Sequence, residues 1–280
     1  MCNKLYGNRM NQSSRIWMLV VILIMFSLTS NAKVITAAED NLMKEKTVAI
    51  VIDDFGNNMQ GTLQMLSMSI PITAAIMPFL PSTKSDAELA YERGHDVIVH
   101  LPLEPEVGKP EWLGPGAIFV HLSDEEIRKR TIAAINDVPH AIGMNNHMGS
   151  KATADERVMR IILTVCKERG LFYLDSKTTS KSVVAKVANE LGVSYVTNNI
   201  FLDDQYTDAH IDKQMNKIHQ LIKEKNQIIA IGHVGPPGKI TASAIKQNIP
   251  ALSRQVKFIR ISDWIAMSYL MEQPMIMPNP

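Results

Sequence analysis

The sequence has few cysteines, almost no excess charge and few aromatic residues, and these shortages exclude some classes of protein. Its only cysteines are Cys2 and Cys166, so a disulfide framework cannot hold the fold together. Its 29 Lys and Arg are balanced by 28 Asp and Glu, and aromatic residues make up 6% of the chain. Because binding to phosphate backbones needs a basic face, this balance argues against DNA or RNA as a partner.

The chain also lacks a long hydrophobic run, because its N-terminal apolar segment, residues 16–28, is shorter than the roughly 20 residues that span a bilayer. Basic residues precede this segment, and Ser30-Asn31-Ala32 provides small residues where a signal peptidase cleaves. We therefore expect residues 1–32 to direct export, as a cleaved signal peptide or as a retained membrane tether. Residues 33–46 are expected to be a linker, and the body of the protein is expected outside the cytoplasm.

The rest of the chain alternates between short apolar runs and helical patterns, which is typical of βα units that build a parallel sheet. Ser123 as N-cap, with Glu126 three residues later, predicts a helix to about residue 135. Asp155 to Arg169 predicts another helix, which Gly170 ends. The predicted strands, about eight in number, are Val48–Asp53, Ile72–Met77, Asp96–Leu101, Ala141–Asn145, Leu171–Asp175, Ser194–Asn198, Ile228–Gly232 and Phe258–Ile261.

This repetition, in a chain of this length, predicts one α/β domain over residues 47–270. A (β/α) barrel of the TIM type, distorted or incomplete, is favoured, and an open doubly wound sheet is the alternative. The chain contains no internal repeat and no glycine-rich phosphate loop. Residues 271–280, rich in Pro and Met, are expected to form a flexible tail.

Polar side chains suited to catalysis follow most of the predicted strands. Because the carboxyl ends of parallel strands open onto one face of a barrel, residues far apart in the sequence are expected to meet there in one cleft. A single histidine at a strand end is more often structural, but its recurrence at several strand ends favours a functional role. The strand-end residues are Asp53, Asp54, His100, Asn145, Asn146, His147, Asp175 and His233.

The adjacent carboxylates of Asp53 and Asp54 point to a metal ion. Both can be ionised in a partly buried site only if a cation compensates their charge. One carboxylate can bind the ion while the other stays free as a base, and His100 and His147 would complete an Asp-His-His set with positions left open for water. The alternative is that this aspartate pair caps the following helix.

Two further segments suit ligand binding. Asn145 and Asn146 lie in GMNNHMGSKAT, where their amides can orient a carboxylate, bind a substrate oxygen or simply form a polar turn. The long loop of residues 102–115 contains Glu104, and such loops often carry binding groups. Cys166 is expected to be a buried, inert thiol. The histidines expected to be ordinary surface residues are His95, His121, His140, His210 and His219.

The motifs VIDDFG, HLPLEP, NNHMGS, YLDSKT and IGHVGPP occur in this order along the chain. Together they resemble the divergent polysaccharide deacetylase family, relatives of the NodB-type carbohydrate esterases, over residues 47–270. The resemblance implies the corresponding barrel and a metal-dependent N-deacetylase of an amino-sugar polymer. It also implies that Asp53 is the base, Asp54 a metal ligand and His233 the acid.

The sequence departs from the pattern of the wider family at two points. Glu104 replaces the second histidine of the H-[ST]-x-x-H motif that begins at His100, and NNHMGS replaces the R-x-P-Y segment whose arginine orients the base. We expect His147 as the third ligand, with Glu104 as the alternative, because a neutral imidazole suits a zinc site that already holds one carboxylate. Zinc is therefore the expected ion. Asn145, Asn146 and Glu104 are the residues expected to contact the substrate.

In the expected mechanism Asp53 takes a proton from the attacking water, and His233 protonates the departing amine. Asp175 could orient His233 or could equally be a structural acid remote from the metal. Two rival functions stay open. One is a catalytically inactive glycan- or metal-binding envelope protein on the same fold, which the loss of the arginine would favour. The other is a different metal-dependent amide or ester hydrolase. The sequence leaves the oligomeric state open.

Overall fold

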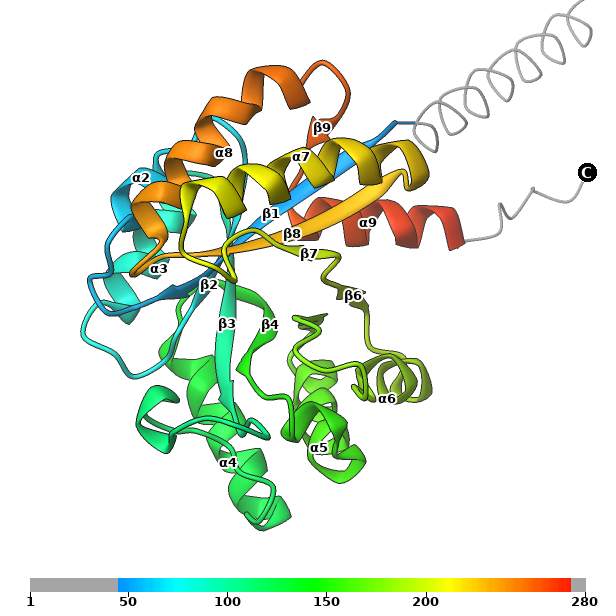
Figure 1. Cartoon of the computed structure of the whole chain (residues 1–280). Helices are drawn as coiled ribbons and strands as arrows, with labels where there is room; N and C mark the ends of the chain where they lie inside the picture. The colour runs from blue at the N-terminus through cyan, green and yellow to red at the C-terminus, as the bar shows by residue number, and fades with distance from the viewer. Residues whose placement is uncertain (1–44, 273–280) are drawn as a thin grey trace, which may run out of the picture. The chain divides into compact units, whose positions relative to one another are not determined.

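The computed structural model describes residues 45–272, whose strands form one parallel sheet in the order β6-β5-β4-β3-β2-β1-β8-β7 (Figure 1). This order follows the chain without the reversal of a doubly wound sheet. No pairing joins β6 to β7 within the described residues, so the barrel is open, as expected. The strands are β1 (Thr47–Phe55), β2 (Thr73–Ile76), β3 (Asp96–Leu103), β4 (Ala141–Met148), β5 (Phe172–Asp175), β6 (Tyr195–Thr197), β7 (Ile200–Phe201), β8 (Gln227–His233) and β9 (Lys257–Phe258), which pairs with β1.

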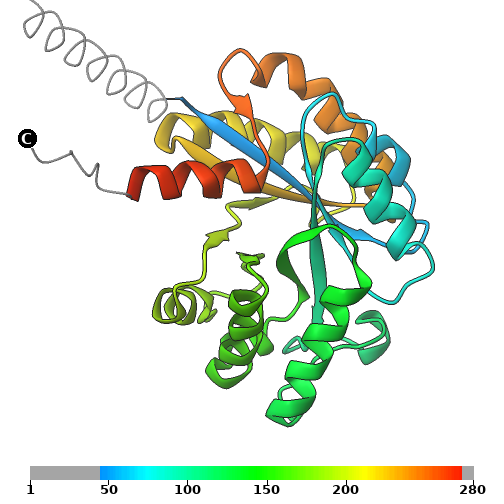
Figure 2. The same cartoon turned by 180° about the vertical axis from the view of Figure 1, so that it is seen from behind.

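Helices surround the sheet, and Figure 2 shows them from behind. The larger apolar cluster packs the helices against one face of the sheet, and a smaller one on the other face includes Ile261, Trp264 and Ile265 of α9. The helices are α2 (Thr62–Leu66), α3 (Thr83–Glu92), α4 (Asp124–Asp137), α5 (Glu156–Glu168), α6 (Val184–Leu191), α7 (Asp208–Glu224), α8 (Gly238–Leu252) and α9 (Ile261–Glu272), with 3₁₀ turns at Pro110–Trp112 and Ala152–Ala154.

The strands are apolar on both faces because both are covered. In β1, Ile50 and Ile52 belong to the larger cluster, whereas Ala49 and Val51 between them belong to the smaller one. This alternation is the two-residue period of a strand. Because both faces of the sheet are covered, β1 is a continuous apolar run up to Ile52. Two aspartates follow this run because the strand there reaches the open end of the barrel.

Most predicted elements lie within two residues of their predicted bounds. Ser123 caps α4 by accepting a hydrogen bond from the backbone N–H of Glu126 at 3.2 Å, as the capping motif predicts. The predicted strand Phe258–Ile261 is wrong at its end, because Ile261 begins α9. The two-residue strand β7 was not predicted, since so short a run has no detectable periodicity.

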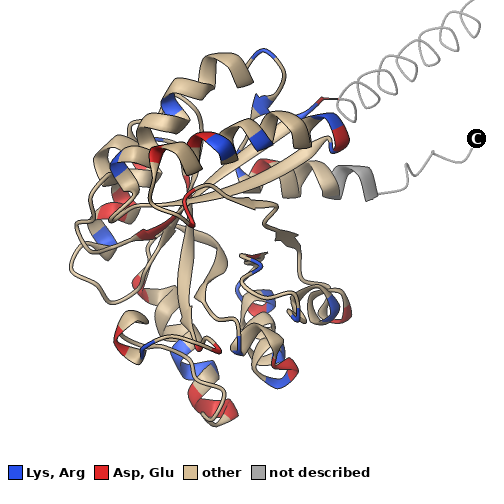
Figure 3. Cartoon of the chain, viewed as in Figure 1, with Lys and Arg blue, Asp and Glu red and all other residues tan. Residues whose placement is uncertain are grey.

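Three expectations about the rest of the chain have different outcomes. Cys166 is buried as expected, and burial raises the pKa of its thiol to about 12. His95 is buried as well, contrary to the expected surface position. The apolar segment of residues 16–28 lies outside the described residues, and within residues 45–272 no helix has the length and apolar character to cross a bilayer. In the view of Figure 3, acidic and basic residues are interspersed along the helices.

Candidate functional site

The register of the sheet brings the strand-end residues together. Asp53 in β1 pairs with His233 in β8, and His100 in β3 pairs with Asn145 in β4. Near Asp54 the register of β1 shifts, and Asp54 has a left-handed backbone with φ of 70°. This irregularity breaks the alternation of a strand, so that two consecutive carboxylates line the same cleft.

Two glycine contacts hold together the segments that follow β1 and β8, the strands that carry Asp53 and His233. The backbone N–H of Gly235 donates to the carbonyl of Gln60 at 2.8 Å. Gly61 has φ of 87°, and a Cβ atom at this position would lie 2.6 Å from the carbonyl carbon of Gly238. Only glycine permits both this conformation and this approach.

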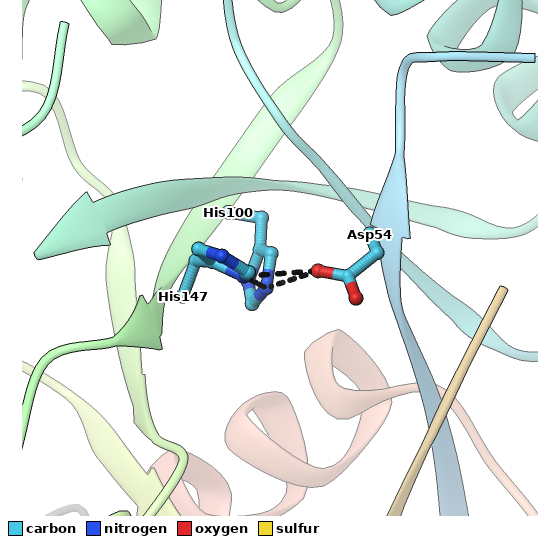
Figure 4. A group of neighbouring side chains, drawn as sticks. All are labelled: Asp54, His100 and His147. Atoms are coloured by element: carbon cyan, nitrogen blue, oxygen red, sulfur yellow. Dashed lines mark hydrogen bonds and ion pairs between the residues drawn. The ribbon is translucent and has the colours of Figure 1, made fainter. Parts of the chain in front are cut away.

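Asp54, His100 and His147 point toward one another from the carboxyl ends of β1, β3 and β4 (Figure 4). Asp54 Oδ1 lies 3.2 Å from His100 Nε2 and 3.0 Å from His147 Nδ1. The two nitrogens are 3.2 Å apart. Within the described residues this is the group of potential ligands gathered closely enough to hold a metal ion. It contains His147 and excludes Glu104.

The hydrogen bonds behind the two imidazoles determine which nitrogens carry protons. His100 Nδ1 lies 2.7 Å from Asn145 Oδ1, and His147 Nε2 lies 3.1 Å from the carbonyl oxygen of Trp112. Both oxygens can only accept, so these nitrogens carry the protons in the neutral rings. The lone pairs of His100 Nε2 and His147 Nδ1 are therefore directed at Asp54, which is how histidines are held in metal sites.

When both rings are neutral, the lone pairs of Asp54 Oδ1, His100 Nε2 and His147 Nδ1 thus meet with no proton between them, and a cation would stabilise this arrangement. Without a cation, burial tends to lower the pKa of His100, but the carboxylates of Asp53 and Asp54 outweigh the effect of burial and raise that pKa above its ordinary value. Burial tends to raise the pKa of Asp54, yet the two histidines hold it well below the usual range. The residues fit a divalent ion with two nitrogen donors and one oxygen donor.

Asp53 lies beside this cluster with a different set of partners. Its Oδ1 accepts a hydrogen bond from Asn145 Nδ2 at 2.9 Å, and its Oδ2 lies 3.7 Å from His100 Nε2. Burial raises the pKa of Asp53, which the nearby His100 and His233 offset only in part. A carboxylate with a raised pKa accepts a proton more readily, as a general base must. Asn145 thus contacts the residue that the family's arginine would orient.

The partner of His233 is Asp203, in the loop between β7 and α7. Asp203 Oδ1 lies 2.7 Å from His233 Nδ1, and Asp203 Oδ2 accepts from the His233 backbone N–H and from Thr241 Oγ1. Burial lowers the pKa of His233, but Asp203, helped by Asp54 and Asp53, raises it to about 9. Since His233 Nδ1 faces Asp203, His233 Nε2 is the nitrogen that can exchange a proton with a ligand in the cleft.

Of the two roles left open for Asp175, the structure supports the structural acid and not the residue that orients His233. Its carboxylate accepts hydrogen bonds from the backbone N–H of Lys177 and from Ser182 Oγ, so it stabilises the turn after β5. Asp203 was not predicted as a site residue because it follows β7, a strand too short to have a recognisable apolar pattern. Its one signal is a second Asp-Asp pair, Asp203 and Asp204, after an apolar residue.

The three residues expected to contact substrate have other partners. Asn145 is fully buried and joins Asp53 to His100. Asn146 donates to the carbonyl of Met148 and accepts from the backbone N–H of Ser176. Glu104 pairs with Lys151 at 2.6 Å and accepts from the Val120 N–H. Asn145 therefore positions the site from behind, Asn146 lines the cleft with its amide held by the backbone, and Glu104 lies outside the metal cluster.

The cleft at the strand ends has a volume of about 290 Å³ and is lined by Asp53, Asp54, His100, His147 and His233. Its walls include Phe201, whose ring stacks on His233 with centroids 6.1 Å apart, and the exposed Tyr206. A larger cavity of about 860 Å³ lies between β6 and β8 and contains none of the cluster residues. The smaller cleft is therefore the candidate site, because it holds the convergent polar groups.

Comparisons with known proteins agree with this geometry. The sequence profile of a family described as divergent polysaccharide deacetylase matches residues 50–265. An uncharacterized protein of Haemophilus influenzae is 35% identical over 206 residues, which cover 74% of this chain and 73% of that protein. The uncharacterized protein YibQ of Escherichia coli is 33% identical over 215 residues, which cover 77% of this chain and 66% of YibQ.

One solved structure supports the fold independently. The crystal structure of the uncharacterized protein ATU2773 from Agrobacterium tumefaciens superposes with a TM-score of 0.73. The match covers 79% of this chain and 89% of that protein, at 20% sequence identity. At this level of identity the likeness concerns the fold.

Proposed function

The chain belongs to the divergent polysaccharide deacetylase family, and from this membership we propose that it is a metal-dependent hydrolase that removes N-acetyl groups from an amino-sugar polymer and releases acetate. The observation that carries the proposal is the convergence of three lone-pair atoms, from Asp54, His100 and His147, beside the buried carboxylate of Asp53. Zinc is the proposed ion because it accepts two imidazoles and one carboxylate and leaves positions open.

The residues around this cluster can perform the proton transfers of amide hydrolysis. A divalent ion held by Asp54, His100 and His147 would supply Lewis acidity. Asp53, held by Asn145, takes a proton from the water that attacks the acetamide carbonyl carbon. His233, held by Asp203, gives a proton to the nitrogen as the C–N bond breaks. The products are acetate and a free amine.

Acetate release from the metal-loaded, full-length protein tests the proposal. N-acetylglucosamine oligomers and peptidoglycan fragments are the two substrates to compare. Acetate from either polymer, abolished by a chelator and restored by zinc, would support it. Stoichiometric metal binding with no acetate from either polymer would favour the non-catalytic glycan- or metal-binding protein. The hydrogen bond from Asn145 to Asp53 argues for the active form, because the base has a partner without the arginine.

We expect Asp203→Asn to move the alkaline limb of the kcat/KM profile to lower pH. With its pKa at about 9, His233 stays protonated up to that pH, and activity that needs the acid form is lost above it. Without the Asp203 carboxylate the pKa of His233 falls toward the ordinary value of about 6.5, so activity is lost at lower pH. The measurement is kcat/KM against pH for both metal-loaded proteins.

Thr241→Val provides the matched control for this experiment. Thr241 Oγ1 donates to Asp203 Oδ2 at 2.7 Å, and its loss leaves the contact between Asp203 and His233 in place. The alkaline limb of this variant should stay near the wild-type position. An Asp203→Asn protein with an unchanged limb would show that His233 is not the acid.

We also propose that the protein is exported, on the basis of the N-terminal basic residues and apolar segment. Fractionation should find the chain outside the cytoplasm. N-terminal sequencing should begin near Lys33 if residues 1–32 are cleaved, whereas a retained tether would leave the full chain with the membrane. Recovery of intact protein with a cytoplasmic marker enzyme would contradict the proposal.

A further inference from the structure

A second cavity, of about 470 Å³, opens beside the candidate site. Its walls come from the loop of residues 104–113, together with Phe119 and Lys151. No residue of this cavity belongs to the metal cluster, and none has a role in the proton transfers proposed above. The cavity therefore needs an explanation of its own.

Two residues, Met148 and Trp112, connect the surroundings of this cavity with those of the catalytic cleft. Met148 lines the cleft, and its methyl group would lie 2.9 Å from a Cβ atom at Gly108, which lines the second cavity. The ring of Trp112 approaches the same Gly108 position at 3.8 Å. Trp112 also contacts the cleft through its backbone, since its carbonyl accepts from His147.

The chemistry of the cavity suits a sugar ring. Lys151 and Glu104 form an ion pair at 2.6 Å and offer a donor and an acceptor, which is what neighbouring hydroxyls require. Pro105, Pro110 and Phe119 provide apolar surface. Trp112 is 59% exposed although it is among the largest apolar side chains, and Lys109 lies over its ring at 5.9 Å. An exposed ring that lies beside Gly108 of the second cavity, in a residue hydrogen-bonded to His147 of the cleft, is placed to stack on a ligand that extends from one to the other.

We propose that this cavity and the Trp112 ring form a second subsite, which binds another sugar residue of the polymer while one residue occupies the metal cleft. The inference rests on the proposed function and narrows the substrate to a chain of sugars that crosses Trp112. A monosaccharide fills only the cleft, so it does not contact the second cavity or the Trp112 ring. Longer oligomers should therefore bind more tightly and react faster.

The test measures binding of the N-acetylglucosamine monosaccharide and hexamer to zinc-loaded, full-length Asp53→Asn protein by calorimetry, so that hydrolysis does not interfere. The hexamer should bind roughly tenfold more tightly than the monosaccharide, the change expected from one aromatic contact with its buried area. Trp112→Ala in the same background should bring the ratio of the two dissociation constants close to one. Trp112→Phe, which keeps a ring, should retain most of it.

Lys151→Met probes the polar side of the subsite, because it removes the charge and keeps much of the chain length, and it should also reduce the ratio. Tyr91→Ala is the matched control. Tyr91 is 56% exposed on α3 and stacks on His140, away from both cavities, so the ratio should not change.

A ratio near one in the parent protein, or a ratio unaffected by both Trp112→Ala and Lys151→Met, would overturn the subsite. A failure of both sugars to bind would also overturn the subsite. Failure of the proposed hydrolysis is a separate result, since acetate release is measured on the protein with Asp53 intact. An affinity that depends on sugar length, without any acetate release, would support the subsite and contradict the proposed hydrolase activity.

Discussion

Asp53→Asn is expected to lower turnover by about 10² to 10⁴-fold, the usual contribution of a general base, while the metal content stays at the wild-type level. The side chain keeps its shape but loses the ability to accept a proton from water. The metal is retained because the three converging ligand atoms come from Asp54, His100 and His147, and Asp53 Oδ2 lies 3.7 Å from the nearest of them.

Asp54→Asn is the matched control for this prediction, because it changes the neighbouring residue in the same chemical way. It should lose metal and activity together, since Asp54 Oδ1 is the oxygen within 3.2 Å of both histidine nitrogens. The measurements are acetate release under saturating substrate and metal content by elemental analysis. An active Asp53→Asn protein would show that another group is the base, but it would not contradict the proposed metal-dependent hydrolysis.

His147→Ala is expected to weaken zinc binding severely. It removes one of three protein ligands, so the loss should exceed the roughly 10- to 100-fold cost of changing a residue that only orients a ligand. The removal also leaves the carbonyl of Trp112 without the imidazole that donates to it. Competition with a chromophoric chelator measures the affinity directly and does not depend on catalysis.

Glu104→Gln is the control that separates the two candidates for the third ligand. Its carboxylate pairs with Lys151 and with the backbone of Val120, so its neutral amide should leave zinc affinity unchanged. Full zinc occupancy in His147→Ala, together with weakened binding in Glu104→Gln, would assign the third ligand to Glu104.

The candidate site could be predicted from the sequence only where residue type and strand position coincide. Asp53, Asp54, His100, His147 and His233 each end a strand whose apolar pattern is clear, and parallel strands deliver their ends to one face. For Asn145 the sequence indicated an amide that could orient a carboxylate, which its hydrogen bond to Asp53 confirms, but the sequence could not decide between this role and contact with a substrate oxygen. An amide can face a substrate or a neighbouring side chain, and only the positions of those neighbours decide between the two.

The sequence by itself determined the curled parallel sheet and the face on which the chemistry lies, because short apolar runs that alternate with helical patterns are local properties of the chain. Tertiary structure alone decided which groups touch. Asp203, and not Asp175, reaches His233 because β7 pairs with β8 and the chain turns back from there. The Trp112 carbonyl directs the His147 lone pair, and a backbone carbonyl exists at every position, so no residue type could reveal it. Such contacts depend on register and loop conformation, which only the folded chain sets.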